Sequence, residues 1–237
     1  MIKKLKIAFL SLLLLSFCIQ KGYSQDNDGF ASNIAKNLTS VATTTNQGLG
    51  SAGYFYNPKI AVDGSEYLFD EWENRAAIYT KDKYIYSLKN INLNINRNSF
   101  VSKVGKDSIF TFDMNNIDKV IINKKTFKSV VSENGNRIYQ VIYEGTDFSV
   151  LRGFTIQTVK SSPNPMVNRR TDRLVKKQVL FLKKNNAVKR FQLTKRKILG
   201  LVNAANKEEV LRYVKDQNLS FRKEEDLNKI LEYSSSL

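Results

Sequence analysis

A cluster of carboxylates surrounds the single tryptophan of the chain, Trp72. The cluster consists of Glu66, Asp70, Glu71 and Glu73. A glycosidase needs two carboxyl groups on either side of a sugar, one as general acid and the other as nucleophile or base. One interpretation is therefore a carboxylate-dependent hydrolase of the glycosidase kind. We favour the other, a set of solvated acids at the end of a strand, because a chain with 22 acidic residues readily brings some of them together.

Other catalytic groups are scarce. The chain contains no histidine, and its only cysteine is Cys18. A Ser-His-Asp triad, a histidine-bound zinc ion and a Cys–His pair are therefore excluded. The acids around Trp72 also lack the regular alternation of a calcium-binding loop, and the chain has no glycine-rich nucleotide-binding motif. We expect no metal and no cofactor, and we favour a protein that is not an enzyme.

Basic residues form the second candidate site. Residues 160–197 contain 13 lysines and arginines and one acid, Asp172. The candidate binding residues are Arg169, Arg170, Arg173, Lys176 and Lys177, and a second group follows at Lys183, Lys184, Lys189, Arg190, Lys195, Arg196 and Lys197. If the strands here pair as a hairpin, these side chains form one basic face that attracts an anionic glycan or a membrane surface. The more ordinary interpretation is charge that is simply solvated on a sheet face.

The first 24 residues have the layout of a secretory signal peptide. A basic start precedes an apolar run at 7–17, and the small residues Gly22 and Ser24 lie at the cleavage positions. The run is shorter than the roughly 20 apolar residues that a membrane-spanning helix needs. We therefore expect cleavage after Ser24, export, and no transmembrane segment in the mature chain.

Two alternatives concern the same segment. It could remain as an N-terminal anchor, or Cys18 could carry a lipid. We favour neither, because the run is followed by polar chain and because Phe17 occupies the place where a lipoprotein has a small residue. Cleavage removes four lysines and no acid, so the formal charge falls from +16 to +12. Since an exported protein rarely meets nucleic acid, we expect no nucleic-acid partner.

The rest of the chain predicts a β-rich α+β fold, an antiparallel sheet or sandwich followed by a short C-terminal helical segment. Residues 25–53 contain few large apolar side chains and predict a flexible leader. Residues 54–193 predict the β body, because short β-branched and aromatic runs alternate with Asn, Asp, Gly and Lys. Residues 194–237 predict three short helices packed on the same domain.

Particular strands and turns can be assigned within the β body. The expected strands are 67–69, 76–80, 84–88, 91–95, 100–104, 108–112, 120–122, 126–131, 138–143, 148–156, 178–182 and 188–193. In 91–95 the apolar and asparagine side chains alternate, which is typical of a half-buried strand. Asn134-Gly135 and Asn185-Asn186 predict hairpin turns. Residues 161–170, with Pro163 and Pro165, predict an exposed loop.

The expected helices have recognisable starts. Thr194 is a candidate N-cap for the first helix, and residues 206–209 resemble a capping box for the second. The third helix is expected to begin near Lys223, with Glu224, Glu225 and Asp226 at its positive end.

Several segments resemble a group of secreted proteins from the Bacteroidota, flavobacteria in particular. The similar pieces are residues 64–72, 91–98, 107–112 and 117–127 and the C-terminal end around 225–233. The resemblance implies export and no particular activity or site residue.

These observations together predict an exported, non-enzymatic binding or structural module of the cell envelope, in which a basic face holds anionic glycan or lipid. The alternative is a secreted, carboxylate-dependent hydrolase. We prefer a periplasmic location to release outside the cell, because 194–237 is predicted to be helical and lacks the C-terminal β-domain of a surface-secretion signal.

Overall fold

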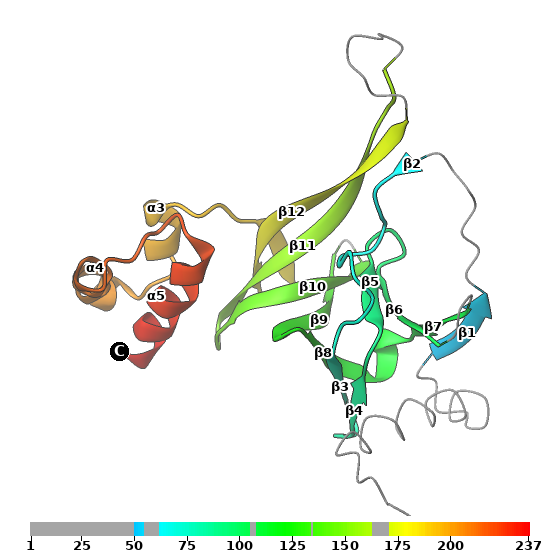
Figure 1. The fold of residues 1–237 in the computed structure, drawn as a ribbon. Coiled ribbons are helices and arrows are strands. Elements are labelled where there is room, and N and C mark those ends of the chain that lie inside the picture. The colour runs from blue at the N-terminus through cyan, green and yellow to red at the C-terminus, as the bar shows by residue number, and fades with distance from the viewer. Residues whose placement is uncertain (1–49, 55–61, 105–107, 134, 163–170) are drawn as a thin grey trace, which may run out of the picture.

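The computed structural model describes residues 50–54, 62–104, 108–133, 135–162 and 171–237. Strands dominate these residues and helices follow at the C-terminal end, which confirms the predicted β-rich fold with a short helical segment. Two sheets and three helices make up most of the structure (Figure 1). The expected signal peptide and nearly all of the expected leader lie outside the described residues.

The larger sheet is formed mostly by the second half of the chain. Its strands are β2 (Val62–Asp63), β3 (Ala76–Thr80), β4 (Ile85–Leu88), β8 (Ile117–Ile122), β9 (Lys125–Ser132), β10 (Gly135–Glu144), β11 (Phe148–Val159), β12 (Asp172–Lys184) and β13 (Ala187–Arg190). Their order is β13-β12-β11-β10-β9-β8-β3-β4. All these neighbours are antiparallel, and only the short β2 pairs with β12 in parallel among the described strands.

The smaller sheet has the order β1-β7-β6-β5. Its strands are β1 (Gly50–Tyr54), β5 (Ile91–Asn94), β6 (Ser99–Lys103) and β7 (Ser108–Phe112). The boundary of the expected leader was wrong here, because residues 50–53 belong to β1 and pair with β7. Backbone groups alone make a ladder, so a segment without large apolar side chains can still pair as an edge strand.

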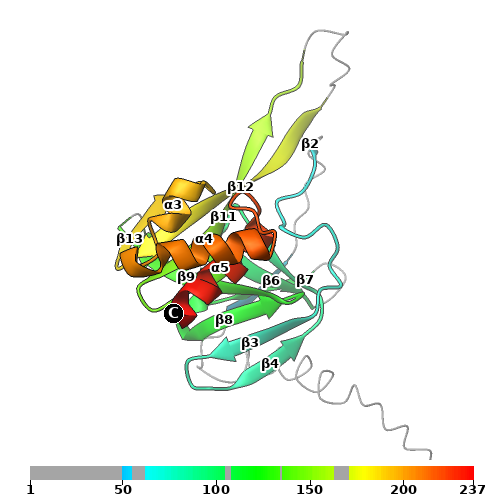
Figure 2. The same ribbon diagram turned by 90° about the vertical axis from the view of Figure 1, so that its left-hand side faces the viewer.

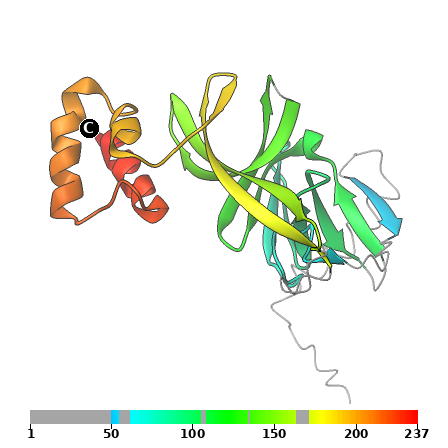
Figure 3. The same cartoon turned by 90° about the horizontal axis from the view of Figure 1, so that it is seen from above.

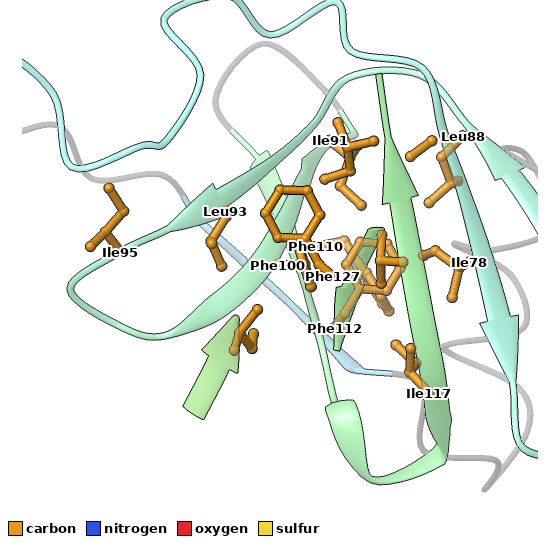
Figure 4. Close-up of a cluster of buried hydrophobic side chains, with 14 of the residues drawn as sticks. Ile78, Leu88, Ile91, Leu93, Ile95, Phe100, Phe110, Phe112, Ile117 and Phe127 are labelled. Carbon is orange, nitrogen blue, oxygen red and sulfur yellow. The ribbon is translucent and has the colours of Figure 1, made fainter. Parts of the chain in front are cut away.

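A core rich in isoleucine and phenylalanine lies between the two sheets. Ile91, Phe100 and Phe110 of the smaller sheet and Ile78 and Phe127 of the larger one are all buried in it (Figure 4). We call the face of the larger sheet that packs against this core the inner face, and the opposite one the outer face. Burial of these side chains is the main force that holds the sheets together.

A second core joins the helices to the other end of the inner face. The helices are α3 (Lys195–Leu199), α4 (Lys207–Asp216) and α5 (Glu224–Ser236), and short 3₁₀ turns lie at Met114–Asn116 and Ala204–Asn206. Ile198, Val210 and Ile230 from these helices pack with Val150 of β11. Phe154, on the same face of β11, belongs to the first core. The helices therefore lie beside the sheets and cover a separate stretch of the inner face (Figure 3).

The helix starts agree only partly with the prediction. The Thr194 side chain accepts a hydrogen bond from the Lys197 amide, which confirms the first N-cap. Helix α5 begins after Lys223 and has three acids in its first turn, as expected. Asn206 makes no side-chain capping bond, so the capping box was wrong. Asn203 caps the 3₁₀ turn before α4 instead, because its side chain accepts from the Ala205 amide.

Strand β5 differs from the half-buried strand that the alternation predicted. Asn92 and Asn94 are as buried as the apolar residues between and beside them. The Asn92 side chain accepts from the Phe69 amide at 3.0 Å and donates to the Phe69 carbonyl at 2.8 Å. The expected strand 67–69 is accordingly a loop with a single bridge from Tyr67 to Asn94. Asparagine side chains hold this loop over the second face of β5.

The hairpin turn between β12 and β13 is confirmed. Asn185 has φ 52°, in the left-handed region that asparagine tolerates better than most residues. The other predicted turn includes residue 134, which lies outside the described residues.

Candidate functional site

Strands β11 and β12 form a long hairpin that carries the basic residues. Their pairing runs from Phe148 opposite Lys184 to Val159 opposite Arg173. Strand β10 accompanies β11 only as far as Arg152, so the distal part of the hairpin projects beyond β10 as a narrow arm (Figure 2). Strand β2 joins the arm near its end, beside Asp172 and Arg173.

The predicted basic residues are not all on one face. Arg169 and Arg170 lie outside the described residues. Along β12, Arg173 and Lys177 lie on the outer face, whereas Lys176 lies on the inner face, because successive side chains of a strand alternate. The packing of Leu182 with the helical core and of Phe181 with a separate cluster on the other face shows the same alternation.

Lys176 is paired with a member of the acidic cluster. Its Nζ donates to Oδ1 of Asp70 at 2.6 Å and to the backbone carbonyl of Leu68 at 3.3 Å. The two candidate sites of the sequence therefore meet, and this contact partly neutralises both. Lys176 is consequently a poor candidate for binding an external anion.

A hollow of about 540 Å³ lies beside this pair. Its lining consists of Asp63, Gly64, Ser65, Asp70, Arg173, Leu174, Val175 and Lys176. Gly64 has φ 98°, and a Cβ there would lie 2.7 Å from the Leu174 carbonyl oxygen, so only glycine lets the two segments approach this closely. The lining combines two acids with two bases, and this balance favours neither an anionic nor a cationic ligand.

The carboxylates of the acidic cluster have separate surroundings. Glu66 accepts from Asn96 at 2.9 Å and from Asn94 at 3.4 Å, whereas Asp70 contacts β12. Glu71 and Glu73 are exposed. Among the described residues, no group of three or more histidines, cysteines, aspartates or glutamates could hold a metal ion. Glu66 and Asp70 thereby tie the 66–74 loop to β5 and β12, respectively.

The aromatic residues of the same loop are also engaged. The Tyr67 and Trp72 rings meet edge to face at 4.7 Å between centroids, and Lys103 Nζ lies 4.8 Å from the Trp72 ring centre. Burial raises the pKa of the Tyr67 hydroxyl above its ordinary value of 10.0, although Asn94 opposes this by hydrogen bonding. Phe69 packs against Phe127 of the first core. These contacts fit packing better than sugar stacking.

An outer basic row remains once the paired residues are set aside. It consists of Arg173, Lys177, Lys183 and Arg190, since Arg190 is opposite Phe181 in the pairing of β12 with β13. No member of this row forms an ion pair with another residue that the structure describes. Arg173, Lys177 and Arg190 are exposed and Lys183 is half-buried. Sequence reasoning placed all four on a single basic face of a hairpin, but it also included Lys176, which the strand alternation puts on the other face.

Sequence reasoning missed another group of cations. Arg75, Lys89 and Lys124 line one hollow at the far end of the larger sheet. They are distant in the sequence, and only the pairing of β3 with β4 and β8 brings them together. No single stretch of chain shows the cluster.

No helix in the described ranges is long and apolar enough to cross a membrane. The resemblance to secreted Bacteroidota proteins stays a prediction, and the geometry above is the basis for inferring function. Comparison of the chain with family models, with characterised proteins and with solved structures finds no match.

Proposed function

We propose that the protein is an exported, non-enzymatic binding module of the cell envelope, in which the outer basic row holds an anionic glycan or lipid surface. The observation that carries this proposal is a set of four cations on one sheet face that have no carboxylate partner among the described residues. A stable fold has no need of such a row, because like charges on one face repel each other. An anionic surface would relieve that repulsion.

The energetics of such a contact are those of many weak attractions. Each lysine or arginine near an anionic membrane contributes about 1 kcal/mol. On the same face of β12, Val175, Val179 and Phe181 lie between these charges and provide apolar contact beside the ionic one. Exposed charges are screened within about 8 Å at physiological salt. Binding is therefore expected to be salt-sensitive and to depend on several cations at once.

The alternative hydrolase gains no support from the described residues. Glu66 and Asp70 make hydrogen bonds to different elements, and Glu71 supports the loop through its backbone carbonyl, which accepts from Asn74 at 2.6 Å. A retaining glycosidase holds its two carboxyl groups about 5 Å apart across a substrate cleft. Asp70 lines the hollow beside Lys176, where it already has a partner.

The binding experiment compares two quadruple variants that remove equal charge. The test variant is Arg173→Gln, Lys177→Gln, Lys183→Gln and Arg190→Gln; the control is Arg212→Gln, Lys215→Gln, Arg222→Gln and Lys229→Gln on and between the helices. The probes are phosphatidylglycerol-containing vesicles, neutral phosphatidylcholine vesicles and polygalacturonate. We expect the test variant to lose at least tenfold in affinity for one anionic probe and the control to stay within about twofold.

Two results would contradict the proposal. Equal losses in both variants would show that only net charge matters, and no binding of either anionic probe by the unaltered protein would remove the function. The choice between vesicle and polygalacturonate identifies lipid or glycan as the ligand. Circular dichroism of both variants shows whether the fold is kept.

Export is tested separately. Intact-mass measurement of the protein from its native cells is expected to give a chain that begins at Gln25. A mass that includes Cys18, with or without a lipid, would contradict cleavage and point to an anchored protein.

A further inference from the structure

Two cations line the same hollow at one end of the larger sheet. Ala76 is opposite Leu88 in the pairing of β3 with β4, so the register continued by one residue brings Arg75 opposite Lys89. On the other side of β3, the Asn123 amide donates to the Arg75 carbonyl at 3.1 Å. Arg75 is thereby placed at the open end of the β3–β4 hairpin, beside the hollow described below.

A third cation completes the group from the turn between β8 and β9. Asn123 and Lys124 form this turn with φ 49° and 66°, both in the left-handed region. The turn is fixed because Asn123 Nδ2 donates to Asn74 Oδ1 at 2.7 Å, and the buried Asn74 in turn donates to the Ile91 carbonyl at 3.1 Å. Lys124 is thus held at the edge of the same hollow, although a left-handed lysine is unfavourable.

The hollow between these cations has a volume of about 500 Å³. Its lining consists of Arg75, Ala76, Ala77, Ser87, Leu88, Lys89, Ile121, Asn123 and Lys124, with no carboxylate among them. Ala77 is opposite both Ser87 and Ile121 in the register. The hollow exists because the side chains of Ala77 and Ser87 are small. Arg75 and Lys124 form no ion pair with any residue in the described part of the chain.

We propose that this hollow binds a small molecule in which one oxyanion is attached to an apolar or ring-shaped body. The phosphate, sulfate or carboxylate group is held by Arg75 and Lys124, and the body lies over Ala77 and Ile121. The volume is within the range of small-molecule sites, which are mostly apolar with a few placed polar groups. This site is independent of the outer basic row, because β4, β3 and β8 are at the opposite end of the sheet order from β12 and β13.

The experiment uses probes that separate the anion from its body. Phenyl phosphate, benzenesulfonate and benzoate share a ring and differ in the anionic group; benzyl alcohol has the ring without charge, and inorganic phosphate has charge without a ring. Binding is followed in the full chain by NMR shifts of the Ala77, Ser87 and Ile121 amides. We expect at least one ring-bearing anion to bind more tightly than both benzyl alcohol and inorganic phosphate.

Variants locate the site. Arg75→Gln and Lys124→Gln are each expected to weaken binding of the best probe about tenfold, whereas Lys81→Gln, at the other end of the β3–β4 hairpin, is expected to leave it within twofold. Ala77→Leu fills the hollow without changing charge and is expected to weaken the ring-bearing probe more than inorganic phosphate. Each variant is checked for unchanged amide spectra away from the hollow.

Three outcomes would overturn this proposal: no shift of these amides with any probe, an Arg75→Gln affinity equal to that of Lys81→Gln, or an unaltered affinity in Ala77→Leu. The quadruple variant of the outer basic row is expected to bind the small probes normally. Failure of the surface-binding proposal therefore leaves this one standing, and the reverse also holds.

Discussion

Lys176 and Asp70 are separated by 106 positions in the sequence, and their side chains meet at 2.6 Å. The contact joins the arm formed by β11 and β12 to the 66–74 loop, which is itself fixed to β5. Asp70 is largely solvent-exposed, with 88% of its side chain accessible, while Lys176 is mostly covered. The pair therefore sets the position of the arm more than it stabilises the fold, because exposed ion pairs contribute little.

A double-mutant cycle tests this view of the pair. We expect Asp70→Asn and Lys176→Met together to give a coupling energy of about 0–1 kcal/mol at low salt, and a smaller one in 1 M salt. The free energy of urea unfolding is the measurement. A coupling well above about 2 kcal/mol that persists in 1 M salt would contradict the exposed character of the pair.

Asn92 is predicted to contribute far more to the stability of the fold than the pair of Lys176 and Asp70. The side chain of Asn92, which is buried on β5, bonds both the backbone amide and the backbone carbonyl of Phe69. Each buried polar group left without a partner costs about 1–3 kcal/mol. We expect Asn92→Ala to lower the free energy of unfolding by about 2–5 kcal/mol. Asn96→Ala is the control, because it removes an exposed hydrogen bond to Glu66 and should cost under about 1 kcal/mol.

The same asparagine explains why part of the fold could not be foreseen. Alternation in 91–95 correctly indicated a strand, since period-2 patterning reflects the backbone geometry itself. It also indicated a solvent-facing side, because asparagine is usually exposed. The pattern could not show that a distant loop would place the Phe69 backbone against Asn92. Burial of a polar side chain depends on such a partner, which sequence alone does not reveal.

The candidate sites were likewise only partly predictable from the sequence. The basic run at 160–197 indicated a cationic hairpin, and the hairpin exists, but alternation along β12 places Lys176 on the inner face and Arg173 on the outer one. Which side chains of β12 share a face could be derived from the sequence once the strand was assigned. The hollow at Arg75 and Lys124 was not available, because it depends on the order of β4, β3 and β8 in the sheet.

Phe127 links the two sheets and is the next residue with a large expected effect. Its ring meets Phe100 edge to face at 5.8 Å between centroids and lies 6.4 Å from the rings of Phe69 and Phe154. We expect Phe127→Ala to lower the free energy of unfolding by about 3–5 kcal/mol, because the cavity it leaves adds to the lost burial. Tyr84→Ala, which alters a side chain that is 65% exposed, should change it by less than about 0.5 kcal/mol. Thermal unfolding of both variants is the measurement, and similar midpoints would show that the sheets do not depend on this contact.

Asp172 is expected to make the end of the arm sensitive to acid. Lys160 Nζ donates to its carboxylate at 2.9 Å and the Ser161 amide donates at 2.7 Å, and these bonds lower the pKa of Asp172 below its ordinary value of 3.8. Since the folded protein favours the charged form, this contribution to stability is complete above pH 3.8 and is lost as the pH falls through the lower, folded pKa. Protonation removes the negative charge that strengthens the bond from the Ser161 amide. We therefore expect the protection of the Ser161 amide against exchange, relative to its intrinsic rate at the same pH, to fall below that pH.

A carboxyl NMR titration of Asp172 tests the cause. Lys160→Gln removes the larger contribution and should raise the pKa of Asp172 toward 3.8. Lys177→Gln removes an equal charge from the same hairpin without touching these hydrogen bonds, so it should move the midpoint less. Equal midpoints in the two variants would mean that general charge on the arm, and not the bond from Lys160, sets the acidity of Asp172.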